Sequence, residues 1–388
     1  MTLPLGYRYS SVHAGIRKDR RDDLALIVSD RTASAAAVFT RNLVQAAPVK
    51  LARKHLKKSG GRVRAVLINA GNANCATPNG DKVALETCRA AAKQIQARAE
   101  EVFPASTGVI GVELDPRLIL NALPGLIQGL APHRFEDAAR AILTTDTGLK
   151  TASREVRLKS GSVRIAGFTK GAGMIQPNMA TTLGFVMLDA AISPRDLRSM
   201  LARAVERSYH RISVDGDTST NDTVLVLANG ASGVKHSEPV ETALCELMED
   251  LARQIVRDGE GARKLITIEV TGAKDDESAA RIARAIANSP LVKTAIAGSD
   301  PNWGRIISAA GNAGVKFDPT RVTIALQGVT VCQRGVAAEF SETSLKTKLD
   351  NKDCAIDFSL RSRAKGHARF WTCDFTEDYI RINASYRT

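Results

Sequence analysis

Chemically reactive residue types are concentrated in one segment, from Lys170 to Phe185, which reads KGAGMIQPNMATTLGF. Its glycines allow close approach and unusual backbone dihedral angles, and Pro177 stiffens the run. Thr181 comes directly before an apolar stretch with the composition of a strand. If the peptide bond before Thr181 were broken, the new α-amine, whose ordinary pKa is about 7.7–8, would act as a built-in general base for the hydroxyl. The residue types allow a self-made nucleophile, although chemistry alone favours an ordinary glycine-rich turn.

The sequence lacks the common cofactor and metal motifs. Gly171 and Gly173 begin a dinucleotide fingerprint, but Gln176 occupies the position of its third glycine. The run that starts at Asp215 begins like a calcium loop, yet it lacks the glycine and the bidentate glutamate of such a loop. The cysteines and histidines are dispersed, without a C-x-x-C pair or two histidines at ligand spacing. We therefore predict no metal site and no bound cofactor.

Apolar runs and helical spacing predict a mixed α+β protein. Ser193 followed by Pro194 is typical of a helix start, and the apolar stripe of residues 241–257 predicts a second helix. A third helix is predicted at residues 84–98. Because strands and helices do not alternate strictly, layered sheets covered by helices are favoured over a doubly wound parallel sheet. Eight runs have the length and composition of strands: residues 24–28, 65–68, 163–168, 183–188, 224–227, 265–270, 322–326 and 355–360.

Length and composition are those of a globular enzyme. The 388 residues allow two or three domains or one large layered domain, and 44% hydrophobic with 24% charged residues argues against disorder. No run approaches the roughly 18 apolar residues of a membrane helix, and residues 1–23 lack the apolar core of a signal peptide. We expect a cytoplasmic protein that does not enter a membrane.

The net positive charge of the chain comes entirely from residues 1–180. Residues 1–180 hold 27 Lys and Arg against 14 Asp and Glu, whereas residues 181–388 hold 27 of each. Such a basic half could bind nucleic acid, steer small anionic substrates, or simply form a solvated surface. Because aromatic residues make up only 4% and no stacking motif accompanies the charge, we favour the solvated surface and predict no nucleic-acid partner.

The segment around Thr181 resembles the self-cleavage motif of the ornithine acetyltransferases (glutamate N-acetyltransferases) of arginine biosynthesis, in which a K-G-x-G-M…P-x-M-A-T run precedes the nucleophile. Two departures from the family pattern are Arg263, where threonine is usual, and the lack of the proline often found after Thr147. Seven further blocks resemble the family in the same order along the chain: Phe39–Asn42, Asn69–Asn74, Ser106–Gly111, Thr144–Thr147, Val214–Asp222, Ala297–Arg305 and Arg381–Thr388.

The resemblance implies a self-processing acyltransferase. Attack of the Thr181 hydroxyl on the Ala180 carbonyl would give an ester, which water opens to leave two associated chains. The mature Thr181 would then accept acetyl from N2-acetylornithine and pass it to L-glutamate in a two-step covalent exchange. Whether acetyl-CoA is also a donor, which would make the enzyme multifunctional, is left open. The rival interpretation is a self-processing aminopeptidase or amidase on a related scaffold that transfers the acyl group to water.

The resemblance also assigns site residues. The Thr107 hydroxyl and the Gly108 N–H are expected to stabilise the oxyanion of each tetrahedral intermediate. Thr145 is an alternative to its neighbour Thr144. Ser219, Thr220 and Asp222 have no assigned role, and we favour satisfaction of buried backbone groups. The expected substrate contacts are Thr144, Lys170, Thr181, Glu260, Asn383 and Thr388.

The implied fold is a four-layer αββα sandwich with a C-terminal lobe at roughly residues 265–388, built from both fragments. The cleavage would divide the chain into an α fragment, residues 1–180, and a β fragment, residues 181–388. Two such pairs are expected to associate as an α2β2 heterotetramer. The other partners are then the small-molecule substrates N2-acetylornithine and L-glutamate.

Overall fold

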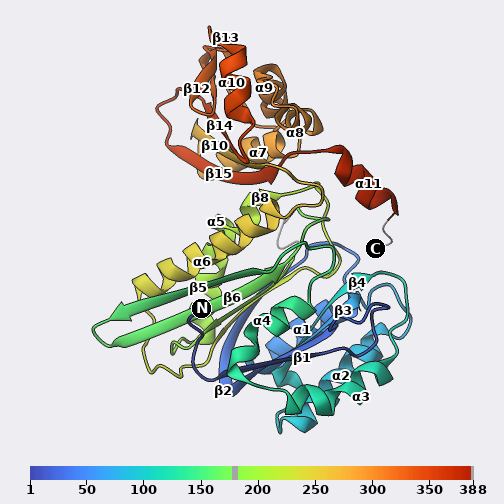
Figure 1. Cartoon of the computed structure of the whole chain (residues 1–388). Helices are drawn as coiled ribbons and strands as arrows, with labels where there is room; N and C mark the ends of the chain where they lie inside the picture. The colour runs from blue at the N-terminus through green and yellow to red at the C-terminus, as the bar shows by residue number, and fades with distance from the viewer. Residues whose placement is uncertain (177–181, 386–388) are drawn as a thin grey trace. The chain divides into compact units, whose positions relative to one another are not determined.

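The structure is a computed structural model that describes residues 1–176 and 182–385. The chain divides into two compact units (Figure 1). The first comprises residues 1–210 and 217–255, and the second comprises residues 211–216 and the described residues from 256 onward. Each unit has its own sheet of parallel and antiparallel strands, so the predicted mixed α+β class is confirmed.

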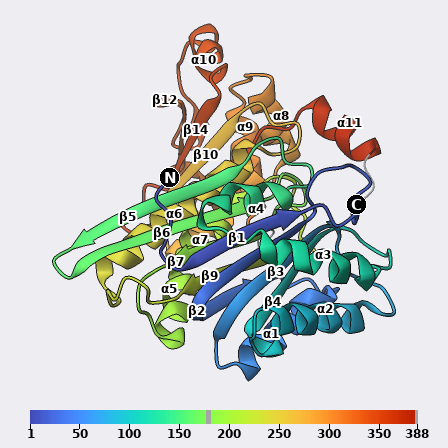
Figure 2. The same ribbon diagram turned by 60° about the horizontal axis from the view of Figure 1, so that its bottom comes forward.

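The sheet of the first unit has eight strands among the described residues, in the order β4-β3-β2-β9-β7-β6-β5, with β1 paired to β2. The long strand β2 is irregular between Val28 and Ala33, which lets its first half pair with β1 and its second half with β9. Figure 2 shows these strands side by side. The strands are β1 (Tyr7–Val12), β2 (Leu24–Phe39), β3 (Arg62–Asn72), β4 (Val102–Val109), β5 (Lys150–Leu158), β6 (Gly161–Lys170), β7 (Leu183–Leu188) and β9 (Thr223–Ala228).

Helices cover both faces of this sheet. One core packs α1 and α4 on a face that carries Phe168 and Phe185. A second core packs α2 and α3 against the strands β2, β3 and β4. Figures 1 and 2 show α5 and α6 alongside the other strands, where Leu251 of α6 packs over Gly167. The helices are α1 (Ala47–Lys58), α2 (Gly80–Gln94), α3 (Pro116–Gln128), α4 (Phe135–Ala141), α5 (Pro194–Arg207) and α6 (Glu238–Arg257).

The second unit has a seven-stranded sheet among its described residues, in the order β13-β12-β11-β14-β10-β15-β8. Its own apolar core packs alanine and isoleucine side chains of α7 against β10 and β15. The strands are β8 (Ile212–Ser213), β10 (Leu265–Ala273), β11 (Thr323–Leu326), β12 (Val329–Gln333), β13 (Val336–Ala337), β14 (Asp353–Ser359) and β15 (Gly366–Cys373). The helices are α7 (Asp276–Ala287), α8 (Pro290–Ala297), α9 (Trp303–Gly311), α10 (Glu342–Leu349) and α11 (Glu377–Ser385).

Each of the eight apolar runs overlaps a strand, and the predicted helix start at Ser193 is confirmed. The Ser193 hydroxyl accepts a hydrogen bond from the Asp196 N–H, while Pro194 occupies the first helical turn. The bounds of the helix predicted at residues 84–98 were wrong, because α2 begins at Gly80 and ends at Gln94. Its first turn is polar, so the apolar stripe did not mark it. No helix in the described part of the chain is long and apolar enough to cross a membrane.

Candidate active site

The start of β7 is held from both neighbouring strands. The expected cleavage site between Ala180 and Thr181 lies outside the described residues, but Thr182 follows it directly and is buried. The Thr182 hydroxyl donates to the Lys170 carbonyl oxygen of β6. On the other side, the Thr223 N–H of β9 donates to the Thr182 carbonyl oxygen at 2.8 Å. The backbone and the side chain of Thr182 are therefore both held by hydrogen bonds to the neighbouring strands.

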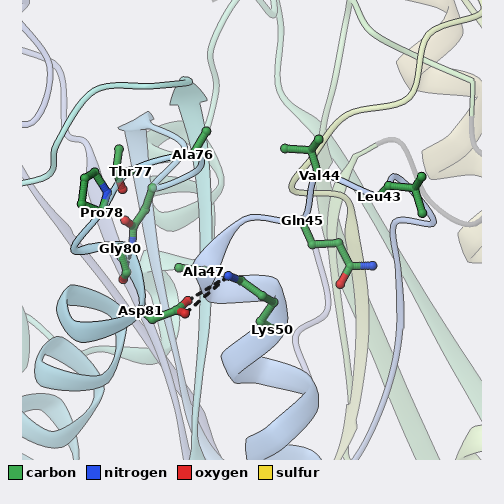
Figure 3. Close-up of a pocket in the computed structure, with 11 residues that line it drawn as sticks. Leu43, Val44, Gln45, Ala47, Lys50, Ala76, Thr77, Pro78, Gly80 and Asp81 are labelled. Atoms are coloured by element: carbon green, nitrogen blue, oxygen red, sulfur yellow. Dashed lines mark hydrogen bonds and ion pairs between the residues drawn. The ribbon is translucent and has the colours of Figure 1, made fainter.

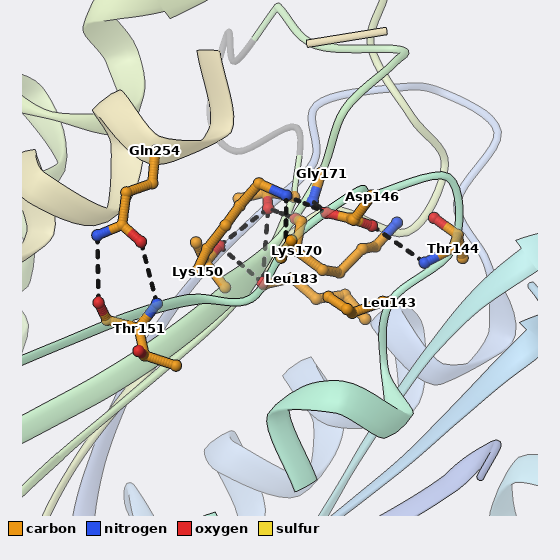
Figure 4. A network of polar contacts seen from close by, with 12 residues as sticks. Leu143, Thr144, Asp146, Lys150, Thr151, Lys170, Gly171, Leu183 and Gln254 are labelled. Atoms are coloured by element: carbon orange, nitrogen blue, oxygen red, sulfur yellow. Dashed lines mark hydrogen bonds and ion pairs between the residues drawn. The ribbon is translucent and has the colours of Figure 1, made fainter. Parts of the chain in front are cut away.

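The buried Asp146 carboxylate joins the loop before β5 both to the start of β5 and to the residue after β6 (Figure 4). The Lys150 ammonium lies 2.6 Å from Oδ1 of Asp146, and both side chains are almost fully buried. The same Oδ1 accepts from the Gly171 N–H at 2.7 Å, and Oδ2 accepts from the Thr144 N–H at 3.0 Å. Burial alone would raise the pKa of the Asp146 carboxyl, but the charges of Lys150 and Lys170 and the hydrogen bonds from Lys150 and the Gly171 N–H hold it below its usual value. Asp146 is therefore an anion that joins the Thr144 loop to the loop after β6.

Lys170 ends β6 and is half-buried. Burial lowers the pKa of its ammonium group, and the positive charges of Lys150 and Arg17 lower it further. The negative charges of Asp146 and Asp222 oppose this shift without cancelling it. Lys170 therefore loses its charge at a lower pH than an exposed lysine does.

Thr107 and Gly108 lie at the end of β4, which pairs in parallel with β3. The backbone of Gly108 has a φ of +131°, and a Cβ atom there would lie 2.2 Å from the carbonyl carbon of Gly71. Only glycine fits so close to a neighbouring strand in this conformation. Gly108 is thus required by the backbone, whatever further role its N–H has.

Asn221 links the segment before β9 to the strand that carries Thr107. Its side-chain Nδ2 donates to the Ser106 carbonyl oxygen at 2.9 Å, to the Ser106 hydroxyl at 2.8 Å and to the Ala73 carbonyl oxygen at 2.7 Å. The Thr220 hydroxyl donates to Oδ1 of Asn221 at 2.7 Å. This buried side chain therefore fixes the end of β4 relative to the segment that leads into β9.

In the second unit, two of the expected substrate contacts meet each other. The Asn383 side chain in α11 donates from Nδ2 to Oε2 of Glu260 at 2.8 Å and to the Tyr379 carbonyl oxygen at 3.1 Å. Glu260 is half-buried and Asn383 is exposed. The carboxylate is thus presented by a hydrogen bond and keeps acceptor capacity for a cationic amine.

Arg263, which departs from the family pattern, contacts the start of α11. Its guanidinium donates to Glu377 at 2.7 Å and to Asp378 at 3.0 Å, and its backbone N–H donates to the Asp374 carboxylate at 2.8 Å. The Glu377 and Asp378 carboxylates raise the pKa of the Arg263 guanidinium above its ordinary value. Arg263 therefore fastens the helix that carries Asn383.

The first unit also has a surface hollow of about 330 Å³ between the β2–α1 and β3–α2 loops (Figure 3). The Lys50 ammonium and the Asp81 carboxylate, 3.2 Å apart, form an ion pair within it. The β3–α2 loop is joined to the end of β4 by the bond from the Ala73 N–H to the Val109 carbonyl oxygen. The hollow is lined by Leu43, Val44, Gln45, Ala47, Lys50, Asn74, Ala76, Thr77, Pro78, Gly80 and Asp81.

Similarity to known proteins covers the whole chain. A curated relative from Desulfotalea psychrophila, the arginine biosynthesis bifunctional protein ArgJ, is 45% identical over 392 residues, covering 99% of each chain. A solved ArgJ structure from Bacillus halodurans is 40% identical with a TM-score of 0.50 and covers 52% of this chain and 98% of that one. A solved ornithine acetyltransferase from Mycobacterium tuberculosis, in complex with ornithine, is 34% identical with a TM-score of 0.42 and covers 46% of this chain and 94% of that one.

These relatives define the class of protein as an acetyltransferase of arginine biosynthesis. The ArgJ family model matches residues 8–388, and the chain belongs to the ArgJ family. It is accordingly an ornithine acetyltransferase, and the expectation drawn from the sequence blocks is confirmed.

The structure brings the expected site residues together in groups. Thr144 and Lys170 both interact with Asp146 in the first unit, and Glu260 and Asn383 meet in the second. Thr107 and Gly108 form a third group at the end of β4, while Ala180, Thr181 and Thr388 lie outside the described residues.

Sequence reasoning missed two residues that organise these groups. Asp146 lies inside the block Thr144–Thr147, and Asn221 lies inside the block Val214–Asp222, so the resemblance pointed at both segments. The sequence does not indicate which residues Asp146 and Asn221 contact. Only the fold brings Asp146 to Gly171 and Asn221 to Ser106.

Proposed function

We propose that the chain cleaves itself between Ala180 and Thr181 and that the new amino-terminal Thr181 carries the acetyl group. Acetyl moves from N2-acetylornithine to the Thr181 hydroxyl, which releases ornithine, and then from Thr181 to the amine of L-glutamate. One amide is exchanged for another, so the reaction needs no external energy. The α-amine of Thr181 serves as general base in both half-reactions.

The observation that carries this proposal is the hold on Thr182. Its hydroxyl donates to β6 and its carbonyl oxygen accepts from β9, so Thr182, which directly follows the proposed nucleophile, is held by both neighbouring strands. Effective acyl transfer needs such a fixed nucleophile, because catalysis depends on holding reacting atoms within a narrow range of geometry.

The oxyanion of each tetrahedral intermediate is stabilised, in this proposal, by the Thr107 hydroxyl and the Gly108 N–H. The rigid backbone at Gly108 supports the role, since preset donors lower the barrier more than mobile ones. Asn221 supports it as well, because it ties Ser106 to the segment before β9.

Substrate binding is proposed for Thr144, Lys170, Glu260 and Asn383, together with Thr181 and Thr388. Lys170 supplies a positive charge for a substrate carboxylate, and Glu260 supplies a negative charge for the distal amine of ornithine. Both Thr144 and Thr145 are candidates for the hydroxyl that faces the substrate, since the hydrogen bond from the Thr144 N–H to Asp146 fixes the backbone and not either hydroxyl.

The proposed assembly is built from the two fragments that cleavage produces. Fragments 1–180 and 181–388 stay associated, form the four-layer αββα arrangement with its C-terminal lobe, and pair as α2β2. The ArgJ relative from Desulfotalea psychrophila is a bifunctional protein by name, which supports acetyl-CoA as a second acetyl donor to glutamate here.

The proposal is tested by supplying purified protein with N2-acetylornithine and glutamate. N-acetylglutamate and ornithine should form in equal amounts, and the Thr181→Ala variant should form neither. Release of acetate without N-acetylglutamate would instead identify a hydrolase. Comparison of acetyl-CoA with N2-acetylornithine as donors then decides the second activity.

A further inference from the structure

Asp222 is a buried carboxyl group to which the proposed acetyl transfer gives no role. It directly precedes β9 and is only 2% exposed. Ser219 hydrogen-bonds to this carboxyl group, but Oδ2 of Asp222 is buried and has no hydrogen-bond partner among the described residues. A buried polar atom without a hydrogen-bond partner destabilises the fold. The Ser219 backbone also hydrogen-bonds to this carboxyl group, in line with the role favoured from the sequence, but that role leaves Oδ2 unexplained.

The strand register puts Asp222 beside the start of β7. The parallel strands β7 and β9 pair Leu183 with Thr223, so Asp222 lies one residue earlier, level with Thr182. On the other side of β7, the antiparallel strand β6 pairs Lys170 with Leu183. Asp222 and Lys170 thus flank the first residues of β7 from its two neighbouring strands, and they interact electrostatically.

Self-cleavage needs a proton carrier that the mature enzyme does not need. Before cleavage, the nitrogen of Thr181 is an amide, so the α-amine that serves acetyl transfer does not yet exist. Attack of the Thr181 hydroxyl on the Ala180 carbonyl forms a C–O bond and breaks a C–N bond. One proton must leave the oxygen and one must reach the nitrogen. A side chain that can do both has to lie next to the start of β7.

We propose that Asp222 is the proton carrier of self-cleavage. The positive charge of Lys170, on β6 at the other side of β7, stabilises the carboxylate form of Asp222. The neutral carboxyl group donates its proton to the departing nitrogen, and the resulting carboxylate takes the proton of the Thr181 hydroxyl. The products are an ester of Ala180 with Thr181 and a free amine, and Asp222 returns to its starting state. Water then hydrolyses the ester. This assignment rests on the proposed cleavage between Ala180 and Thr181.

Electrostatics favours the protonated form of Asp222 more than it does for an exposed aspartate. Burial raises the pKa of its carboxyl group well above the usual value, against the opposing effect of Lys170 and of local hydrogen bonds. The charge on Lys170 is itself weakened, because burial, Lys150 and Arg17 lower its pKa while Asp146 and Asp222 oppose them. An ordinary aspartate is almost fully ionised near neutral pH, so the raised pKa makes Asp222 the better proton donor.

The test compares splitting rates of the full chain after a pulse of synthesis, read as fragment formation on denaturing gels and by mass spectrometry. The variants are Asp222→Asn, which keeps the shape but cannot carry the proton, and Asp222→Glu, which restores a carboxyl group. The matched control is Asp189→Asn at the other end of β7. Asp189 is equally buried, and its oxygens accept from the N–H groups of Arg164 and Leu5. Thermal unfolding checks that each variant is folded.

Asp222→Asn should slow splitting by at least about 10²-fold, in line with the loss of a general acid–base group, and Asp189→Asn by less than about threefold. Acetyl transfer per split chain should stay within about tenfold for Asp222→Asn, because the α-amine has taken over. Wild-type splitting should slow as the pH rises through the raised pKa of Asp222. The Asn variant should lack this dependence, and the Glu variant should regain part of the rate.

The proposal is overturned if Asp222→Asn splits at the wild-type rate, if both Asn variants slow splitting equally, or if splitting is normal and only acetyl transfer is lost. A wild-type chain that never splits is a different result. It would remove the proposed self-cleavage itself and not merely its proton carrier.

Discussion

The side-chain amide of Asn383 donates a 2.8 Å hydrogen bond to the carboxylate of Glu260, although 123 residues separate them. The bond presents the carboxylate from the loop after α6, and Arg263 fastens the helix that carries Asn383. In the proposed mechanism, this pair recognises the cationic side chain of ornithine. The two residues can therefore be tested separately, one for charge and one for position.

Glu260→Gln should raise the KM for N2-acetylornithine about 10- to 100-fold, because it removes the negative charge but keeps the shape of the side chain. The expected loss corresponds to about 1.4–2.7 kcal/mol of binding free energy. Steady-state kinetics with N2-acetylornithine as the varied substrate measures it. Glu377→Gln is the control, because it removes the same charge from α11, the helix that carries Asn383. It should change KM only slightly. A similar KM for both variants would exclude Glu260 as the charge partner.

Asn221→Ala should lower turnover more than it lowers stability. The substitution removes the Asn221 donor from the buried Ser106 carbonyl oxygen, at about 1–3 kcal/mol for an unsatisfied group, while the Ala73 carbonyl oxygen keeps its hydrogen bond from the Ser106 hydroxyl. Asn229→Ala is the matched control at the other end of β9, where the amide donates to the carbonyl oxygens of Leu5 and Gly6. Both variants should unfold at lower temperature, but only Asn221→Ala should lose turnover beyond the loss of folded protein. Equal activity in the two would argue against a positioning role.

Thr107→Ala should lower kcat by about 10²-fold with little change in KM, as the loss of one oxyanion donor does. Thr107→Ser, which keeps the hydroxyl, should recover most of the rate. Single-turnover measurement of acetyl transfer to the enzyme isolates the chemical step. If the Ala variant forms the acetyl-enzyme at the wild-type rate, Thr107 is not an oxyanion donor.

The KM for glutamate should rise toward alkaline pH. Burial, Lys150 and Arg17 lower the pKa of the Lys170 ammonium, against Asp146 and Asp222. A lysine binds a carboxylate only while it is protonated, so binding is present below this lowered pKa and is lost as the pH rises through it. Lys170→Arg keeps its charge across this range. Its KM, although higher at neutral pH, should lack the alkaline rise, and an unchanged profile in that variant would assign the rise to another group.

Strands buried within the sheet could be predicted from the sequence because their apolar runs are continuous. β7 and β9 were expected at residues 183–188 and 224–227, and both are fully buried along their length. β4 was missed, although it carries Thr107 and Gly108. Its Pro104 and its Ser-Thr-Gly run have the composition of a turn, and the parallel pairing with β3 overrides that local preference.

The site could be predicted only in part. Motifs located the segments, and the resemblance assigned roles to single residues within them. The pairing of Asp146 with Lys150 and Gly171 could not be derived, because a buried ion pair is fixed by tertiary packing that local sequence does not encode. The same holds for Asp222, whose unusual burial is visible only once β7 and β9 lie side by side.

The central claim is that Thr181 becomes an amino terminus. Amino-terminal sequencing and intact-mass measurement of the active protein test it most directly. The account predicts a fragment that begins Thr-Thr-Leu-Gly and a partner that ends at Ala180, present in equal amounts. A fully active preparation that contains only the uncut 388-residue chain would contradict it.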